Sequence, residues 1–111
     1  MAKFVVNTRK DGQFMFNLKA GNGRVILTSH GYQTKLACLN GIDSVQIVSR
    51  EEKRFIRNVT RDGRLYFDLK ATNGLIIGMS EIYESEAGLQ NAIWSVMRNA
   101  YDADIIDETI A

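Results

Sequence analysis

The fold is decided by the stretch Phe14-Met15-Phe16-Asn17-Leu18-Lys19-Ala20-Gly21-Asn22-Gly23, which has a close copy 51 residues later, Leu65-Tyr66-Phe67-Asp68-Leu69-Lys70-Ala71-Thr72-Asn73-Gly74. Apolar and polar residues alternate in both. An extended strand with this pattern places Phe16 and Leu18 on one face and Asn17 and Lys19 on the other. Each half of the chain is therefore predicted to contain a strand with one buried face.

The same spacing extends over most of the chain. Residues 4–49 align with residues 55–100 without a gap, and 17 of the 46 aligned pairs are identical, against about three expected by chance. One copy of about 50 residues would bury little of its surface, whereas two copies with a common core reach an ordinary domain size. We predict a single domain over residues 1–111, with repeat one at 3–50 and repeat two at 54–108.

Turn-forming dipeptides predict the other strands of each repeat. Asp-Gly precedes the alternating stretch and Asn-Gly follows it in both copies, and these dipeptides supply the positive φ angles that tight hairpins need. Hairpins require a strand on either side of each turn. Strands are therefore expected at 4–8 and 24–28 in repeat one, and at 55–59 and 75–79 in repeat two.

A change of period then predicts one helix per repeat. Leu89, Ile93 and Val96 recur at helical spacing, and Thr34 and Ser85 stand where an N-cap hydroxyl is needed. The β-branched segment 103–107 suits a short closing strand. The predicted fold class is α+β, with two tandem β-β-β-α(-β) repeats that form one antiparallel sheet with both helices packed on one face.

Three segments resemble those of the YegP-like family, whose members are small bacterial proteins of one or two such units. They are residues 16–26, their partner segment 67–80, and Gly41-Ile42-Asp43-Ser44-Val45. The resemblance covers nearly the whole chain. It implies βββα units with an added strand exchanged between them, merged into a single sheet. It implies no activity and no catalytic residues.

No residues of this chain are expected to be catalytic, cofactor-binding or metal-binding. His30 is the sole histidine, and no second histidine or cysteine lies near it in sequence to complete a metal site. Cys38 is the sole cysteine and lies on the apolar stripe of the first helix, which favours a buried structural role. We therefore expect a protein without a cofactor that is not an enzyme.

Two surfaces are candidates for binding. One is the polar face of the sheet, which the alternation opens to solvent; the other is a flank of aromatic and methionine residues on the second helix. The residues of this predicted interaction surface are Met15, Lys19, Arg64, Tyr66, Lys70, Trp94, Met97 and Tyr101.

The leading functional hypothesis is a small non-enzymatic binding or interaction module, whose partner is a second copy or another protein. The alternative is a weak nucleic-acid-binding sheet surface. That alternative is disfavoured by the net charge of +1 and by Tyr66 as the single aromatic residue of the polar face. The N-terminal segment has no long apolar run, and the lone cysteine suits a reducing compartment, so a cytoplasmic location without membrane insertion is expected.

Overall fold

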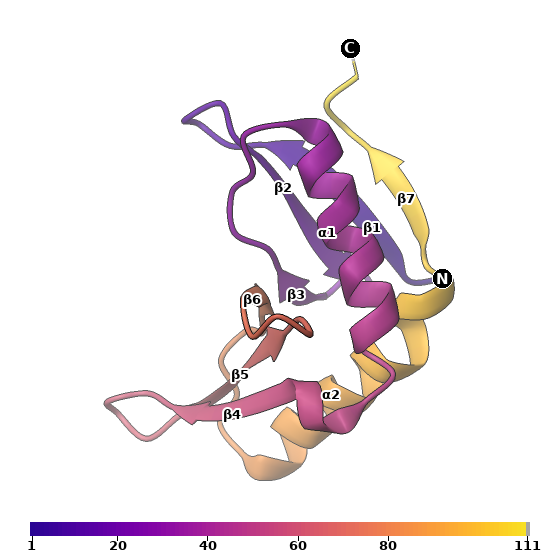
Figure 1. Ribbon diagram of the computed structural model, residues 1–111. Helices are drawn as coiled ribbons and strands as arrows, with labels where there is room; N and C mark the ends of the chain where they lie inside the picture. The colour runs from indigo at the N-terminus through magenta and orange to yellow at the C-terminus, as the bar shows by residue number, and fades with distance from the viewer. Residues whose placement is uncertain (111) are drawn as a thin grey trace.

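The computed structural model describes residues 1–110, and over this part of the chain it contains one seven-stranded sheet and two α-helices (Figure 1). The predicted strand boundaries agree with the structure to within one residue. The strands are β1 Lys3–Thr8, β2 Phe14–Lys19, β3 Val25–Thr28, β4 Phe55–Val59, β5 Leu65–Lys70, β6 Ile76–Met79 and β7 Asp104–Asp107; the helices are α1 Lys35–Val48 and α2 Glu86–Asn99, and the short 3₁₀ turns are η1 Glu52–Arg54 and η2 Ala100–Asp102.

Glycine provides the left-handed position of each hairpin turn. Gly12, Gly23, Gly63 and Gly74 have φ between 84° and 87°, and no other residue type has a positive φ in the described part of the chain. Each predicted dipeptide thus supplies the positive φ of its turn through its glycine. The side chain of Asn22 accepts a hydrogen bond from the N–H of Arg24 at 3.0 Å, which fixes the turn locally.

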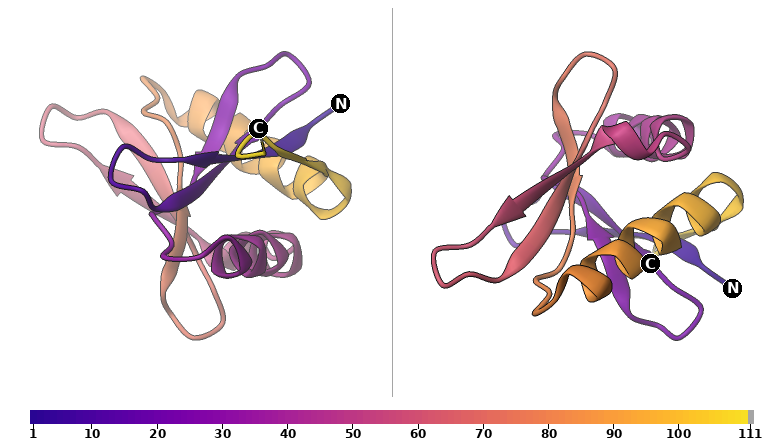
Figure 2. Two further views of the ribbon diagram at one scale, coloured as in Figure 1. Left: turned by 90° about the horizontal axis from the view of Figure 1, so that it is seen from above. Right: turned by 90° about the horizontal axis from the view of Figure 1, so that it is seen from below.

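The strands lie in the order β4-β5-β6-β3-β2-β1-β7. The two repeats meet where Thr28 of β3 pairs with Met79 of β6, and these two residues are equivalent in the duplication. An approximate two-fold axis therefore passes through the middle of the sheet. Figure 2 shows that the two halves of the sheet are strongly twisted against each other and that both helices lie on the same side.

The predicted sheet is mostly antiparallel, and the closing strand β7 forms its one parallel pair among the described residues. β7 of repeat two pairs with β1 of repeat one, in a register that aligns Phe4 with Ile105 and Val5 with Ile106. The chain enters β7 from α2 and η2 and not from a hairpin turn out of β1, so nothing forces an antiparallel pairing of β7 with β1. The Nζ of Lys35, in the first turn of α1, holds this strand through the carboxylate of Asp107 at 2.8 Å.

The helices join the two repeats across the axis. Helix α1 contacts β2 of its own repeat and β6 of the other, and α2 contacts β5 and β3 in the same way. Their first turns are capped as predicted, because the hydroxyl of Thr34 accepts from the N–H of Ala37 and that of Ser85 accepts from the N–H of Gly88. Each such cap contributes about 1 kcal/mol.

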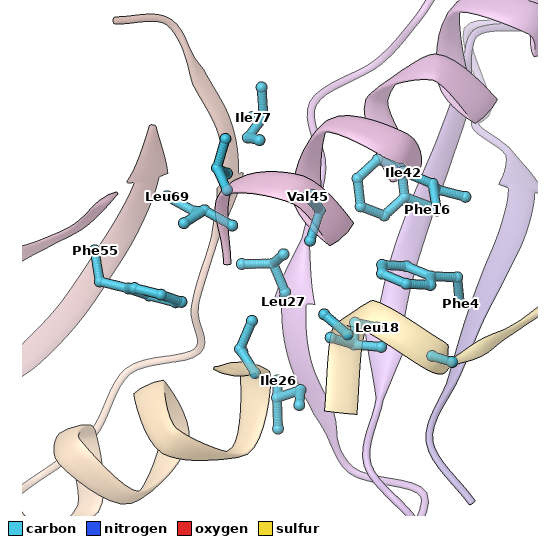
Figure 3. Close-up of a cluster of buried hydrophobic side chains, with 14 of the residues drawn as sticks. Phe4, Phe16, Leu18, Ile26, Leu27, Ile42, Val45, Phe55, Leu69 and Ile77 are labelled. Atoms are coloured by element: carbon cyan, nitrogen blue, oxygen red, sulfur yellow. The ribbon is translucent and has the colours of Figure 1, made fainter. Parts of the chain in front are cut away.

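The core lies between the sheet and the helices and is continuous through both repeats. Figure 3 shows Leu27 in the middle of this cluster, with Phe55 and Leu69 on one side and Phe4 and Phe16 on the other. Cys38 is fully buried in the same core. Burial, together with the negative charge of Asp107, raises the pKa of its thiol to about 11, so the cysteine is a structural residue, as the helical stripe predicted.

Candidate functional site

The face of the sheet opposite the helices is uncovered, and we call it the open face. The strand registers place one row of side chains across all seven strands on this face: Ile56, Asp68, Met79, Thr28, Asn17, Val5 and Ile106. The row has the approximate two-fold symmetry of the repeats, with Thr28 and Met79 at its centre. Its first member, Ile56, lies on the edge strand β4. Val5, the equivalent residue, has Ile106 of β7 beside it.

A groove of about 470 Å³ lies on the open face where the repeats meet. Its exposed apolar side chains are Ile76 and Met79, which are 45% and 49% accessible. His30 and Glu81, which occupy equivalent positions in the two repeats, add a titratable group from each. The lining residues are Thr28, Ser29, His30, Ile76, Gly78, Met79, Ser80 and Glu81.

Two buried serines fix the backbone around the groove. The hydroxyl of Ser29 accepts from the N–H of Phe16 at 2.9 Å and donates to the C=O of His30 at 2.7 Å. Ser80 makes the same pair of bonds, with the N–H of Phe67 and the C=O of Glu81. A hydroxyl that both donates and accepts inside the protein is satisfied without water. The same pair of serine hydrogen bonds therefore fixes the backbone of the groove in each repeat.

The centre of the row differs between the repeats. In repeat one the hydroxyl of Thr28 donates to the side-chain oxygen of Asn17 at 2.9 Å. In repeat two Met79 has no hydroxyl, and Oδ1 of Asp68 is buried without a hydrogen-bond partner; Oδ2 of the same carboxylate accepts from the side chain of Asn58 at 2.8 Å. The groove thus has a polar side at Thr28 and an apolar side at Met79.

Five of the predicted interaction residues belong to the open face but do not line this groove. They are Met15, Lys19, Arg64, Tyr66 and Lys70, all half-buried. Lys19 lines a second depression near β7 together with Lys3 and Ile106. The side chain of Arg64 is engaged by Asp62 at 3.0 Å and by Glu84 at 3.9 Å. Their role in binding stays a prediction.

The other three predicted residues belong to the helix layer. Trp94 and Tyr101 are about half exposed, and Met97 packs against the core. The guanidinium of Arg50 lies 5.6 Å from the centre of the Tyr101 ring, which is a cation–π distance. Because both helices cover the opposite side of the sheet, these residues do not join the open face in one surface.

The residues that form the groove were not predicted from the sequence. Ile76, Met79 and Glu81 come from repeat two and His30 from repeat one, and they meet only because β3 and β6 pair across the axis. The one local signal is Met79, an apolar residue where the matching strand of repeat one ends in Thr28.

Residues 1–110 contain no group of three or more His, Cys, Asp or Glu side chains arranged to hold a metal ion. No helix in the same range is long and apolar enough to cross a bilayer. The ring of His30 lies 4.3 Å from the ring of Tyr32, and its Nδ1 is 2.9 Å from the C=O of Gly31.

Comparison with known proteins gives the family. A model described as a domain of unknown function, DUF1508, matches twice, at residues 10–55 and 61–107, so that each match covers most of one repeat. The chain belongs to the DUF1508 family. It is similar to a UPF0339 protein of Pseudomonas aeruginosa, 43% identical over 97% of this chain and 98% of the relative, and to one of Mannheimia succiniciproducens, 52% identical over 90% of this chain and 88% of the relative.

Solved structures agree with the fold. The chain is similar to the solution NMR structure of a UPF0339 protein from Shewanella oneidensis, with a TM-score of 0.90 and 44% identity over 96% of this chain and 90% of that one. It is also similar to the solution NMR structure of YegP from E. coli, described as a protein of unknown function, with a TM-score of 0.92 and 38% identity over 96% and 92% of the two chains. The resemblance to YegP-like proteins is confirmed.

Proposed function

We propose that this protein is a non-enzymatic binding module whose open face takes apolar side chains of a protein partner into the groove at the repeat junction. The observation that carries the proposal is the groove itself, about 470 Å³ in volume, with Ile76 and Met79 exposed inside it. Concave apolar sites with a few polar groups are typical of binding sites. The serine hydrogen bonds supply rigid walls, so little ordering free energy is lost on binding.

The charges of the open face balance. Lys3, Lys19, Arg64 and Lys70 belong to this face by register or alternation, and so do the acids Asp68, Asp104 and Glu81, while Glu108 lines the depression that contains Lys19. Partner choice is therefore assigned to the exposed apolar groove and not to a net charge of the face. We propose no enzymatic role, because the titratable groups of the groove are His30 and Glu81, and general acid–base catalysis needs a larger convergent set of such groups.

Site-specific photo-crosslinking inside the cell tests this proposal. A photoreactive amino acid placed at Met79 should give discrete protein adducts, whereas the same group at Ile47, an exposed apolar position on α1, should not. Binding of the purified cross-linked partner should fall at least tenfold in a Met79→Glu variant and less in a Met15→Glu variant. Adducts of equal pattern from both positions would contradict the proposal.

The same experiment separates a nucleic-acid role. If the adducts from Met79 disappear on nuclease treatment, the partner is a nucleic acid and not a protein. Binding of a single-stranded oligonucleotide would then weaken steeply with salt, because each neutralised phosphate releases counterions.

A further inference from the structure

Within residues 1–110, the outer edge of β4 has no neighbouring strand, whereas the equivalent edge of β1 is paired with β7. The sheet ends at β4 on one side and continues beyond β1 to β7 on the other. In the two-fold arrangement of the repeats, β1 and β4 are equivalent. The partner of β4 would come from the segment after α1, but that segment forms the turn η1 and then β4 itself (Figure 1). The position beside β4 that corresponds to β7 is therefore open.

The backbone of β4 has its hydrogen-bonding groups turned toward this open position. Arg57 pairs with Phe67 in the ladder, yet the N–H and the C=O of Phe67 are bonded to Ser80 on the other side. The backbone groups of Arg57 consequently face outward. In repeat one the equivalent residue, Val6, uses its outward C=O to accept from the N–H of Glu108, just after β7, at 2.9 Å. An exposed edge of this kind is a template for strand addition.

Side-chain exposure at β4 matches the loss of a covering strand. The side chain of Val5, beside β7, is 3% accessible, whereas that of its equivalent Ile56, which has no strand of the described chain on its outer side, is 37% accessible. Val6 is fully buried, whereas the Arg57 side chain that replaces it is 40% exposed. A strand seated like β7 would place its two central residues beside Phe55 and Ile56, as Ile105 and Ile106 lie beside Phe4 and Val5.

Nearby charges indicate which residue should follow the two central residues of such a strand, at the position that Asp107 has in β7. In repeat one Lys35 holds Asp107 at 2.8 Å. The residue equivalent to Lys35 is Glu86, so the sign is reversed. Arg57 lies 3.6 Å from Glu52 and 3.7 Å from Glu86, and it also donates to the side chain of Gln90. Within this group of three side chains, one arginine faces two carboxylates, and Lys53 and Arg54 of the same turn are paired with Glu51 instead. A cation at the position of Asp107 would have Arg57 as its register partner and would balance the group by reaching Glu86.

We propose that the free edge of β4 binds an extended segment of a partner protein as an additional strand, parallel to β4, with two apolar residues followed by a lysine or arginine. The two apolar residues cover Phe55 and Ile56, the cation lies against Glu86, and the backbone bonds to Arg57. This surface is separate from the groove of the open face, and binding at one does not require the other.

Peptide titrations test the proposal with two acetylated and amidated peptides. The first is Ala-Asp-Ile-Ile-Lys-Glu-Thr, the sequence of residues 103–109 with lysine in place of Asp107, and the second keeps the aspartate. In ¹⁵N-labelled full-length protein, the lysine peptide should shift amides of residues 55–59 and bind at least tenfold more tightly than the aspartate peptide. Glu86→Lys should reverse this preference, since it restores the charge found in repeat one.

Backbone methylation of the lysine peptide separates strand addition from attraction between charges. Just after β7 the N–H of Glu108 points to β1, and that of Ile106 points the same way because N–H directions alternate from one residue to the next along a strand. Methylation of the two peptide nitrogens equivalent to Ile106 and Glu108 should abolish binding. Methylation of the two equivalent to Ile105 and Asp107 should leave the Kd within threefold of that of the unmethylated peptide. Equal affinity of both methylated forms, shifts centred on the groove, or an unchanged preference in the Glu86→Lys variant would overturn the proposal.

Self-association is the remaining outcome. If sedimentation shows a concentration-dependent dimer and the lysine peptide dissociates it, a second copy occupies the edge and the proposed partner is wrong. A monomer that binds the lysine peptide as described supports the proposal.

Discussion

The central pair of the open face shows how one residue changes a duplicated structure. Thr28 and Met79 are equivalent, and so are Asn17 and Asp68. The two side chains of the pair are hydrogen-bonded to each other in repeat one only, between Thr28 and Asn17. A buried acceptor without a donor costs about 1–3 kcal/mol relative to a satisfied one. Repeat two carries this cost beside the groove, where Met79 supplies an exposed apolar surface. The loss of the hydroxyl is therefore consistent with selection for binding at this position.

Restoring the hydroxyl should stabilise the protein. Met79→Thr lets a hydroxyl donate to Oδ1 of Asp68, as Thr28 donates to Asn17, and it should raise the free energy of unfolding by about 1 kcal/mol relative to Met79→Val. Valine is the matched control because it has the same branched shape without the hydroxyl. Urea denaturation of both variants measures the difference. Equal stabilities would show that the carboxylate oxygen gains nothing from a donor at this position.

At the scale of elements, the closing strand depends on one ion pair that joins the two repeats. The ammonium group of Lys35 and the bonds from Thr109 lower the pKa of Asp107 to about 2, below its value of about 3.9 in an unfolded chain. The ionised carboxylate is therefore favoured by the folded state. Its contribution is complete above about pH 5 and is lost progressively as the pH falls through the folded-state pKa of about 2.

An Asp107→Asn variant should show this pH dependence directly. The wild-type protein should be the more stable of the two at pH 7, and the gap in unfolding free energy should stay constant down to about pH 5. Below about pH 5 the gap should narrow, and most of it should be gone at about pH 2, because the carboxylate becomes protonated first in the unfolded and then in the folded state. Urea unfolding at pH 7, 4 and 2.5 measures the gap. A gap that is unchanged at pH 2.5 would contradict the assigned role of the charge.

At the scale of the whole molecule, the axis between the repeats leaves room for one large side chain. Leu27 is fully buried there, and its equivalent is Gly78, at which an added Cβ would lie 2.8 Å from Cγ of Leu27. The repeats therefore cannot be identical at this position. The leucine of one repeat fills the space that the glycine of the other leaves.

Exchange of the two side chains tests this packing. Gly78→Leu alone should overfill the axis and cost about 1–3 kcal/mol or more, and Leu27→Gly alone should leave a cavity with a cost of at least about 2–5 kcal/mol. The double variant should be more stable than either single variant, because it restores one leucine to the axis. Additive losses in thermal or urea unfolding would show that the two positions do not share one space.

The shared core also predicts unfolding in one step. The sheet joins the repeats twice, through the pair of Thr28 with Met79 between β3 and β6 and through β7 beside β1. The common core and the crossed helices add to this connection. Trp94 fluorescence reports on repeat two, and hydrogen exchange of β1 and β2 reports on repeat one. Both should give the same unfolding free energy. A lower value for one repeat would indicate two independent units.

Local sequence determined most of the fold. Alternation, Asn-Gly turns and helical spacing depend on contacts within a few residues, so the strands, the N-caps at Thr34 and Ser85 and the buried role of Cys38 followed from the sequence. The duplication then placed these elements twice. The open face was predicted for the same reason, because an alternating strand under one helical layer exposes its polar side.

Tertiary structure decided what lies where the repeats meet. The parallel pairing of β7, the single leucine at the axis, the groove beside Met79 and the free edge of β4 all depend on residues that are half the chain apart or more. No local preference encodes such contacts, because they arise from how two nearly equal units share one core and one sheet. The sequence by itself thus determined the unit and its repetition, and the packing of the two units determined the surfaces on which binding is proposed.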